Sequence, residues 1–185
     1  SEAMRISAGG SLFIGKDSNR QTRSGNSSFS PNIQLESDSV AAMSITRFAD
    51  TTAPGRLVIQ KGRGTGASPT VVQDGDQAGQ ILFSCWDGDT FTNTAQIRSE
   101  VDGTPGDDDM PGNLIFYTSA DGASTVSERL RINSSGNIGI GDNNPDQKLC
   151  VQGSGTTILK LENTDDGTAQ ITLANTGSSN GQIKQ

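Results

Sequence analysis

The sequence predicts an all-β fold made of repeated antiparallel, sandwich-like modules. Apolar residues alternate with polar ones over short runs, turn residues separate these runs, and no stretch shows the three-four apolar spacing of an amphipathic helix. Of the 185 residues, only 31% are hydrophobic and 4% aromatic, while 23 are glycine. Because this composition provides little apolar surface per residue, we expect each chain to complete its core against neighbouring chains.

One stretch of the chain occurs twice. Residues 128–141, ERLRINSSGNIGIG, align without a gap with residues 2–15, EAMRISAGGSLFIG, at an offset of 128 − 2 = 126 residues. The same offset places residues 33–36 on residues 159–162. A single offset over both blocks predicts a long structural repeat, and we expect the chain to be a piece of a longer protein.

The repeat predicts four segments. Residues 1–31 form a hairpin and connector that end the preceding repeat, and residues 32–132 form a complete β module. Residues 133–157 form a hairpin turn and connector, and residues 158–185 form the truncated start of the next module. Because apolar residues recur at the same positions, residues 158–185 are expected to fold like their counterparts in the first module.

The clearest predicted element is a hairpin around residues 133–137. This turn contains Gly136, a residue that tolerates positive φ, and the apolar residues before and after it fall on one face. Such a hairpin is too small to be stable alone, so this face is predicted to pack against strands of other chains in a trimer. The predicted packing residues are Leu130, Ile132, Ile138 and Ile140.

Alternation predicts further strands along the chain. They lie around residues 4–6, 12–14, 33–35, 43–45, 57–59, 71–72, 80–86, 95–101, 114–117 and 148–151. In the 95–101 strand, Gln96, Arg98 and Glu100 alternate with apolar residues, which predicts one solvent-facing side. Residues 16–31 are rich in Ser, Asn and Arg and are predicted to be a connector, and residues 61–69, with three Gly and one Pro, are predicted to be a loop.

Residue types exclude several function classes. The chain has no His, which removes the Ser-His-Asp and Cys-His arrangements and histidine metal sites. Its net charge of −7 argues against nucleic acid as a partner, and no apolar run approaches the roughly 20 residues of a membrane span. Cys85 and Cys150 are predicted to be buried free thiols, and no cofactor is expected.

Two groups of acidic residues are candidate sites. Glu100 with one acid of residues 107–109 would supply the paired carboxylates of a glycan-cleaving enzyme. Acids beside glycines are more often turn formers, which is the favoured interpretation here. Residues 74–76 and 87–89, both Asp-Gly-Asp, offer oxygens to calcium but lack the spacing of a calcium loop. We therefore predict no catalytic and no metal-binding residue.

Two consecutive stretches carry a family resemblance. Residues 95–122, AQIRSEVDGTPGDDDMPGNLIFYTSADG, and residues 127–151, SERLRINSSGNIGIGDNNPDQKLCV, resemble repeat modules of bacteriophage tail fibres. The similarity is to modules that precede an endosialidase-type intramolecular chaperone domain. It implies an elongated, parallel homotrimer located in the phage tail, with the modules joined by hairpin connectors.

The resemblance also implies a function. A non-catalytic structural and adhesive segment would space or present a receptor-binding surface, with other tail proteins and a host surface glycan or protein as partners. The expected receptor-facing loop contains Thr104, Asp107, Asp108 and Asp109. Two alternatives stay open: a glycan-cleaving tailspike-like enzyme, and a repeat of a bacterial surface adhesin. The repeat favours a spacer, because repetition sets length whereas an enzyme site is needed once.

Overall fold

The structure is a computed structural model that describes residues 4–6, 12–14, 22–24, 27–29, 33–35 and 39–154. The chain divides into two compact units, residues 1–152 and residues 153–185. The predicted strands of the truncated second module, including residues 159–161, lie outside the described residues.

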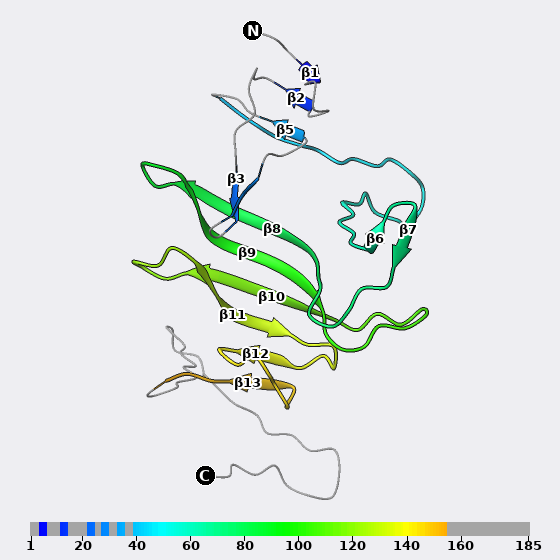
Figure 1. The fold of residues 1–185 in the computed structure, drawn as a ribbon, viewed down its shortest axis with the longest axis vertical. Helices are drawn as coiled ribbons and strands as arrows, with labels where there is room; N and C mark the ends of the chain where they lie inside the picture. The colour runs from blue at the N-terminus through cyan, green and yellow to red at the C-terminus, as the bar shows by residue number, and fades with distance from the viewer. Residues whose placement is uncertain are drawn as a thin grey trace, which may run out of the picture. The chain divides into compact units, whose positions relative to one another are not determined.

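All regular structure among the described residues is β-strand (Figure 1). The strands are β1 (Met4–Ile6), β2 (Leu12–Ile14), β3 (Thr22–Ser24), β4 (Ser27–Phe29), β5 (Ile33–Leu35), β6 (Arg63–Thr65), β7 (Ser68–Thr70), β8 (Gln77–Trp86), β9 (Phe91–Val101), β10 (Gly112–Ser119), β11 (Val126–Ile132), β12 (Ile138–Ile140) and β13 (Leu149–Val151). The all-β prediction is confirmed, and most strand pairs are antiparallel. No helix in the described part of the chain has the length and apolarity needed to cross a membrane.

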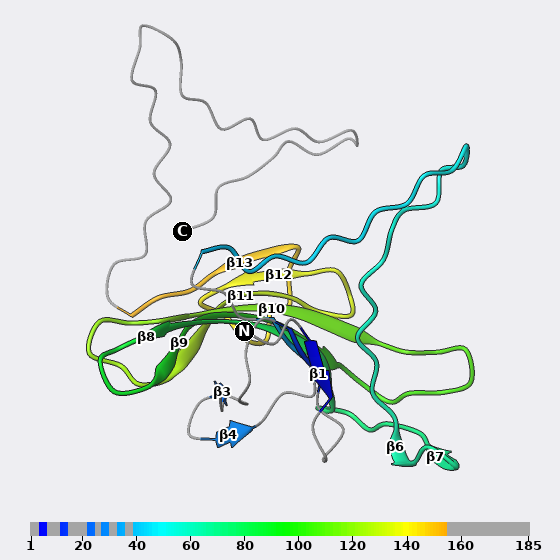
Figure 2. The same cartoon turned by 90° about the horizontal axis from the view of Figure 1, so that it is seen from above.

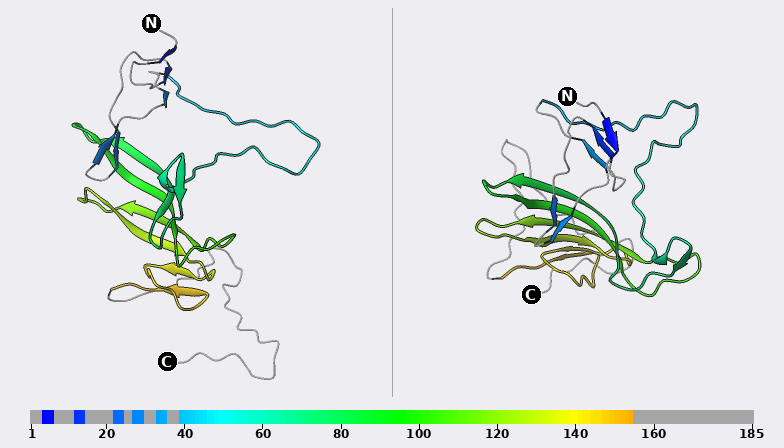
Figure 3. Two further views of the ribbon diagram at one scale, coloured as in Figure 1. Left: turned by 45° about the vertical axis from the view of Figure 1, so that its right-hand side comes forward. Right: turned by 45° about the horizontal axis from the view of Figure 1, so that its top comes forward.

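The main element is a six-stranded sheet with the order β13-β12-β11-β10-β9-β8. From β8 to β12 the strands follow one another as antiparallel neighbours, and β13 adds in parallel to β12. Figure 2 shows these strands one behind another as a single curved layer, and Figure 3 shows their order from two further directions. No second sheet of comparable size occurs among the described residues, so the sandwich-like form of the module stays a prediction.

The two copies of the recurring hairpin pair alike. In β1 and β2, Met4 is opposite Ile14, and in β11 and β12 Leu130 is opposite Ile140, which is the same register shifted by the repeat offset. Each hairpin also receives a third, parallel strand, but from different positions. β5 adds to β2, whereas the short strand β13 adds to β12. The hairpin is therefore alike in both copies, and its third strand is not.

The turn of the second hairpin is fixed by one side chain. Asn133 Oδ1 accepts the backbone N–H groups of Ser135 at 3.1 Å and Asn137 at 2.9 Å, and Gly136 takes the predicted positive φ of 71°. In the strand that follows, a Cβ at Gly139 would collide with the backbone oxygen of Asp142. The lack of a side chain at Gly139 thus allows the close approach of a backbone segment of the same chain.

Three predicted strands are wrong. Residues 43–45, 57–59 and 71–72 form no strand in the structure, although the first two carry a strand-like alternation. A strand needs a neighbour for its backbone hydrogen bonds, and no described strand pairs with residues 43–45 or 57–59. The side chains of Met43 and Leu57 are correspondingly exposed, by 66% and 62%.

Two predicted loops contain short hairpins instead. Residues 16–31 include the paired strands β3 and β4, and residues 61–69 include most of the β6–β7 hairpin. In the second case, Gly64 adopts positive φ and the Thr65 hydroxyl accepts the backbone N–H of Ser68 at 3.1 Å, which closes the turn. Glycine-rich composition predicts the turn but hides the strands on either side of it.

An ion-pair cluster ties the β6–β7 hairpin to the end of the sheet. Asp76 accepts hydrogen bonds from Arg63 Nε at 2.6 Å, Arg63 Nη2 at 2.9 Å, Lys61 Nζ at 2.8 Å and the backbone N–H of Gln73 at 2.9 Å. The backbone of Asp76 also pairs with Val101, the last residue of β9. These donors hold the pKa of the Asp76 carboxyl well below its usual range, with Arg63 contributing most.

Candidate functional site

The two faces of the six-stranded sheet differ in chemistry. Because cross-strand partners point to the same side of a sheet, the strand registers define rows of side chains. One complete row consists of Ile81, Ile97, Phe116, Leu130, Ile140 and Val151, one residue from each strand. A second row on this side consists of Ser99, Leu114, Ile132, Ile138 and Leu149. We call this side the apolar face and the opposite side the polar face.

Much of the apolar face is exposed in the single chain. Its large side chains at least 36% exposed are Ile81, Phe83, Leu114, Phe116, Ile132, Ile140, Leu149 and Val151. Soluble monomers rarely expose a contiguous apolar patch of this extent, and such patches mark interaction surfaces. The predicted packing residues Leu130, Ile132, Ile138 and Ile140 all belong to this face, where they are partly or substantially exposed.

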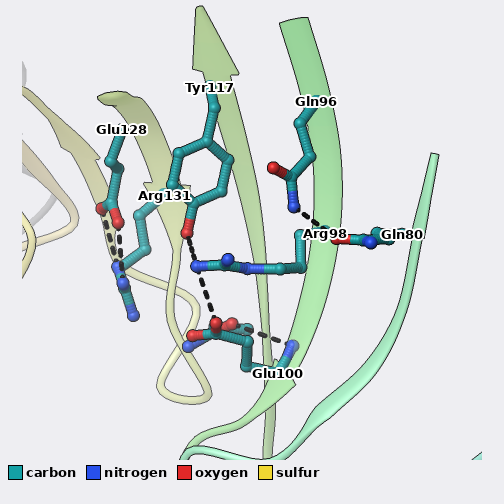
Figure 4. A network of polar contacts seen from close by, with 8 residues as sticks. Gln80, Gln96, Arg98, Glu100, Tyr117, Glu128 and Arg131 are labelled. Carbon is teal, nitrogen blue, oxygen red and sulfur yellow. Dashed lines mark hydrogen bonds and ion pairs between the residues drawn. The ribbon is translucent and has the colours of Figure 1, made fainter. Parts of the chain in front are cut away.

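The polar face carries a connected set of side chains (Figure 4). Gln96 donates to Gln80 at 2.8 Å, Arg98 pairs with Glu100 at 2.7 Å, and Arg98 also donates to the Tyr117 hydroxyl. The Arg98 guanidinium lies 4.5 Å from the centre of the Tyr117 ring, a cation–π geometry. On the next strand, Arg131 makes two hydrogen bonds of 2.8 Å to Glu128.

The polar face is the better covered of the two, which reverses the expectation from sequence. Gln96 is 6% exposed, Asn113 5% and Tyr117 9%, and Ile115, which lies among them, is fully buried. Burial raises the pKa of Tyr117, and the hydrogen bonds that Arg131 donates to Glu128 raise the pKa of Arg131. The long side chains of the predicted solvent-facing side pair with one another, and strand β3 also lies close to β9 of this sheet.

Glu100 and the acids of residues 107–109 have different surroundings. Glu100 is half-buried and paired with Arg98, and its backbone N–H donates to Asn113. Asp107, Asp108 and Asp109 are exposed in the β9–β10 loop, where Gly106 and Asp109 form a small bridge and Asp108 has a φ of 52°. Glu100 is thus part of an ion pair, and residues 107–109 form a turn.

The carboxylates of the Asp-Gly-Asp segments accept hydrogen bonds from other groups of the chain. Asp87 accepts the backbone N–H groups of Asp89 and Thr90 and the hydroxyl of Thr92, which lowers the pKa of Asp87 to about 2. Asp74 accepts the backbone N–H of Gly103 at 2.8 Å. In the described part of the chain, no group of three or more His, Cys, Asp or Glu side chains could hold a metal ion.

Both cysteines are free, as predicted, but they are not buried. Cys85 is exposed on β8, and Cys150 is half-buried on β13, with Sγ 3.7 Å from Asp146 Oδ1. The alternation around Cys85 correctly indicates a strand, yet β8 lies at the edge of the sheet, where the Cys85 side chain stays exposed.

The expected receptor-facing loop lies next to a cavity. The cavity has a volume of about 310 Å³ and is lined partly by Met110 and Pro111, which follow Asp109 in the β9–β10 loop. Val72 and Val101 supply apolar surface to it, and Lys61, Asp76 and Glu100 supply charge. This volume is at the small end of the range for ligand pockets. Thr104 is exposed at the start of the same loop.

Solved structures provide the comparison, since no protein-family model and no curated protein matches the sequence. The carboxy-terminal domain of the bacteriophage T5 L-shaped tail fibre is 15% identical with a TM-score of 0.59, over 90% of this chain and 67% of that one. The same domain with its intramolecular chaperone domain is 16% identical with a TM-score of 0.60, over 99% of this chain and 50% of that one. The resemblance to tail fibre modules is thus confirmed in the fold: the chain is similar in structure to the carboxy-terminal domain of a phage tail fibre.

Proposed function

We propose that this chain is a non-catalytic structural segment of a phage tail fibre whose copies assemble through the apolar face of the six-stranded sheet. Two observations together support this proposal. The fold is similar to that of a tail fibre domain, and an apolar row of partly exposed side chains crosses all six strands of the sheet. A row of this kind is stable in water only when another surface covers it.

The proposed assembly is a homotrimer with Leu130, Ile132, Ile138 and Ile140 at its packing surface. These four residues are two directly opposed cross-strand pairs, Leu130 with Ile140 and Ile132 with Ile138. They therefore form one compact apolar patch on the three-residue strand β12 and its neighbour β11. Burial of such a patch against other copies would supply the stability that a hairpin of this length lacks.

The proposed place of the segment is the virion tail, with other tail proteins as neighbours. Contact with a host surface glycan or protein would be made by the β9–β10 loop, which contains Thr104, Asp107, Asp108 and Asp109. The exposure of this loop and the adjoining cavity support that role. An enzymatic role is not favoured, because Arg98 already pairs with Glu100.

The mass in solution tests the proposal. Light scattering of the wild-type chain is expected to give the mass of three chains, and Ile140→Asp is expected to shift it toward one chain. A carboxylate buried in the packing surface without a partner would cost at least several kcal/mol. Ser135→Asp, in an exposed turn of the same hairpin, is the matched control and should leave the mass unchanged. A wild-type monomer, or an Ile140→Asp trimer of unchanged stability, would contradict the proposal.

A further inference from the structure

Strand β8 forms an open edge of the six-stranded sheet. Its ten residues, QAGQILFSCW, pair with β9 on one side, and no strand among the described residues pairs with the other. The strand contains no proline and no charged residue, which are two devices that usually protect an edge. The opposite edge strand, β13, has only three residues. The exposed edge of β8 is therefore suited to receive another strand.

The regular part of this edge lies in the middle of β8. Register shifts in the β8–β9 ladder occur between Gln77 and Gly79 and between Phe83 and Ser84, so residues 79–83 are regular between them. Ile81 and Phe83 are 44% and 48% exposed there. An added strand centred on these residues would extend the backbone ladder and the apolar face together.

Residues 40–48 have the composition of a strand but no strand partner among the described residues. Their sequence, VAAMSITRF, has neither proline nor glycine and a single charge, at Arg47. Val40, Met43, Ile45 and Phe48 are 74%, 66%, 50% and 95% exposed. Within the described residues, no backbone hydrogen bond joins this segment to another part of the chain. Its backbone N–H and C=O groups are thus available to a neighbour.

The chain folds back after this segment, and the returning part contacts the sheet. A Cβ at Gly55 would stand 3.2 Å from the backbone oxygen of Ile45, so the chain returns close to itself there. The Ile59 side chain then lies against Gly79 of β8, with Cγ2 2.5 Å from where a Cβ would be. Because residues 55–59 lead back to their own sheet, residues 40–48 are the part left for another molecule.

We propose that residues 40–48 of one copy add as a strand to the exposed edge of β8 in a second copy. This inference rests on the proposed assembly of copies and names a contact within it. The two segments match in length, nine residues beside ten, and both combine apolar side chains with available backbone groups. Strand addition is a common mode of recognition in which backbone hydrogen bonds provide affinity. Among the described residues of one chain neither segment has this pairing, and in the proposal a second copy supplies it.

The exposed thiol of Cys85 on β8 allows a direct test by disulfide trapping. In a Cys150→Ser background, cysteines are introduced one at a time by Ala41→Cys, Met43→Cys and Thr46→Cys, and the full chain is mildly oxidised. Opposed residues of adjacent strands bring their Cβ atoms to about 4.5–5.5 Å, and the closer, non-hydrogen-bonded pairs come within reach of the roughly 3.5–4.5 Å that a disulfide needs. At least one variant is expected to convert most of the chain into a disulfide-linked species of two or more chains on a non-reducing gel.

Controls separate this contact from random collision. Asp107→Cys, in the exposed β9–β10 loop, and each variant combined with Cys85→Ser should stay uncrosslinked. A disulfide formed within one chain overturns the proposal, because it assigns the segment to its own sheet. An oligomer of unchanged mass that forms no crosslink from any of the three positions overturns strand addition alone. A monomer by light scattering overturns both this inference and the proposed assembly.

Discussion

The two faces of the six-stranded sheet carry opposite chemistry, and their burial is the reverse of what hydropathy alone suggests. On the polar face, Gln96, Asn113 and Tyr117 are each at most 9% exposed. On the apolar face, Phe116 and Ile140 are 36% and 42% exposed. On the polar face the long side chains pair with one another, whereas the aliphatic side chains of the apolar face need another surface to cover them.

The comparison distinguishes the face of the sheet that is buried within one chain from the face that is left exposed for assembly. The polar face encloses Ile115, the one side chain that is fully buried among the described residues. The core of the single chain is therefore small: its other buried hydrophobic side chains in the described part are Val72, Val101 and Tyr117. With so small a core, a large share of the stability should depend on covering the apolar face.

Neighbouring residues on β10 give the largest expected difference between the faces. Ile115→Ala should destabilise the folded chain by about 2–5 kcal/mol, because it opens a cavity beneath the polar face. Leu114→Ala, one residue earlier and 39% exposed on the apolar face, should weaken assembly with little effect on the stability of one chain. Urea denaturation at several protein concentrations distinguishes these effects, since only assembly depends on concentration.

The reverse result would remove the distinction between the faces. If Leu114→Ala lowered stability equally at every protein concentration, the apolar face would be part of the core of one chain. If Ile115→Ala had no effect on the urea midpoint, the polar face would not be a core at all. Either outcome would also undermine the assignment of Leu130, Ile132, Ile138 and Ile140 to the packing surface.

The sequence predicts the strands of the main sheet well but not the segments that depend on neighbours. Alternation and turn residues locate β8 to β13 and the hairpin around Gly136, because these features are local. The absence of a strand at residues 43–45 could not be predicted, since alternation indicates a strand without saying which molecule pairs with it. The coverage of the polar face was missed because the pairing of Arg98 with Tyr117 depends on strand register, which one strand does not reveal.

The polar network should give an intermediate effect. Arg98→Met removes the ion pair with Glu100, the hydrogen bond to Tyr117 and the cation–π contact, and it leaves the Glu100 carboxylate half-buried without its cation. Arg98 Nε has no hydrogen-bond partner among the described residues, which reduces the net gain from the native side chain. We expect a loss of about 1–3 kcal/mol.

Arg98 variants also test whether a change on the polar face affects assembly through the apolar face. Arg98→Lys should restore part of the stability through the charge but not the planar stacking on Tyr117. Because the change lies on the polar face, the mass of the assembled species should be the same for wild type and both variants above the concentration at which they assemble. A change of mass without a change of the single-chain urea midpoint would place Arg98 in the packing surface and contradict the division between the faces.

The smallest expected effect is the response to acid. Hydrogen bonds lower the pKa of Asp87 to about 2, and the Ser134 backbone N–H lowers the pKa of the Asp102 carboxyl. A carboxyl of unfolded protein has a pKa near 3.9. Because the folded value is the lower one, this stabilisation is fully present above about pH 4 and is lost as the pH falls toward 2. The melting temperature should therefore fall across this interval.

A charge-free variant at the β8–β9 turn isolates this contribution. Asp87→Asn should be slightly less stable than wild type at pH 7, and its melting temperature should decline less steeply between about pH 4 and pH 2. The rows of the apolar face contain no carboxylate, so acid should not release the copies from one another while the strands remain folded. Circular dichroism and light scattering measured on the same acid series check this. Dissociation at a pH where the β signal is still intact would mean that acidic groups contribute to the packing surface and that its apolar character has been overstated.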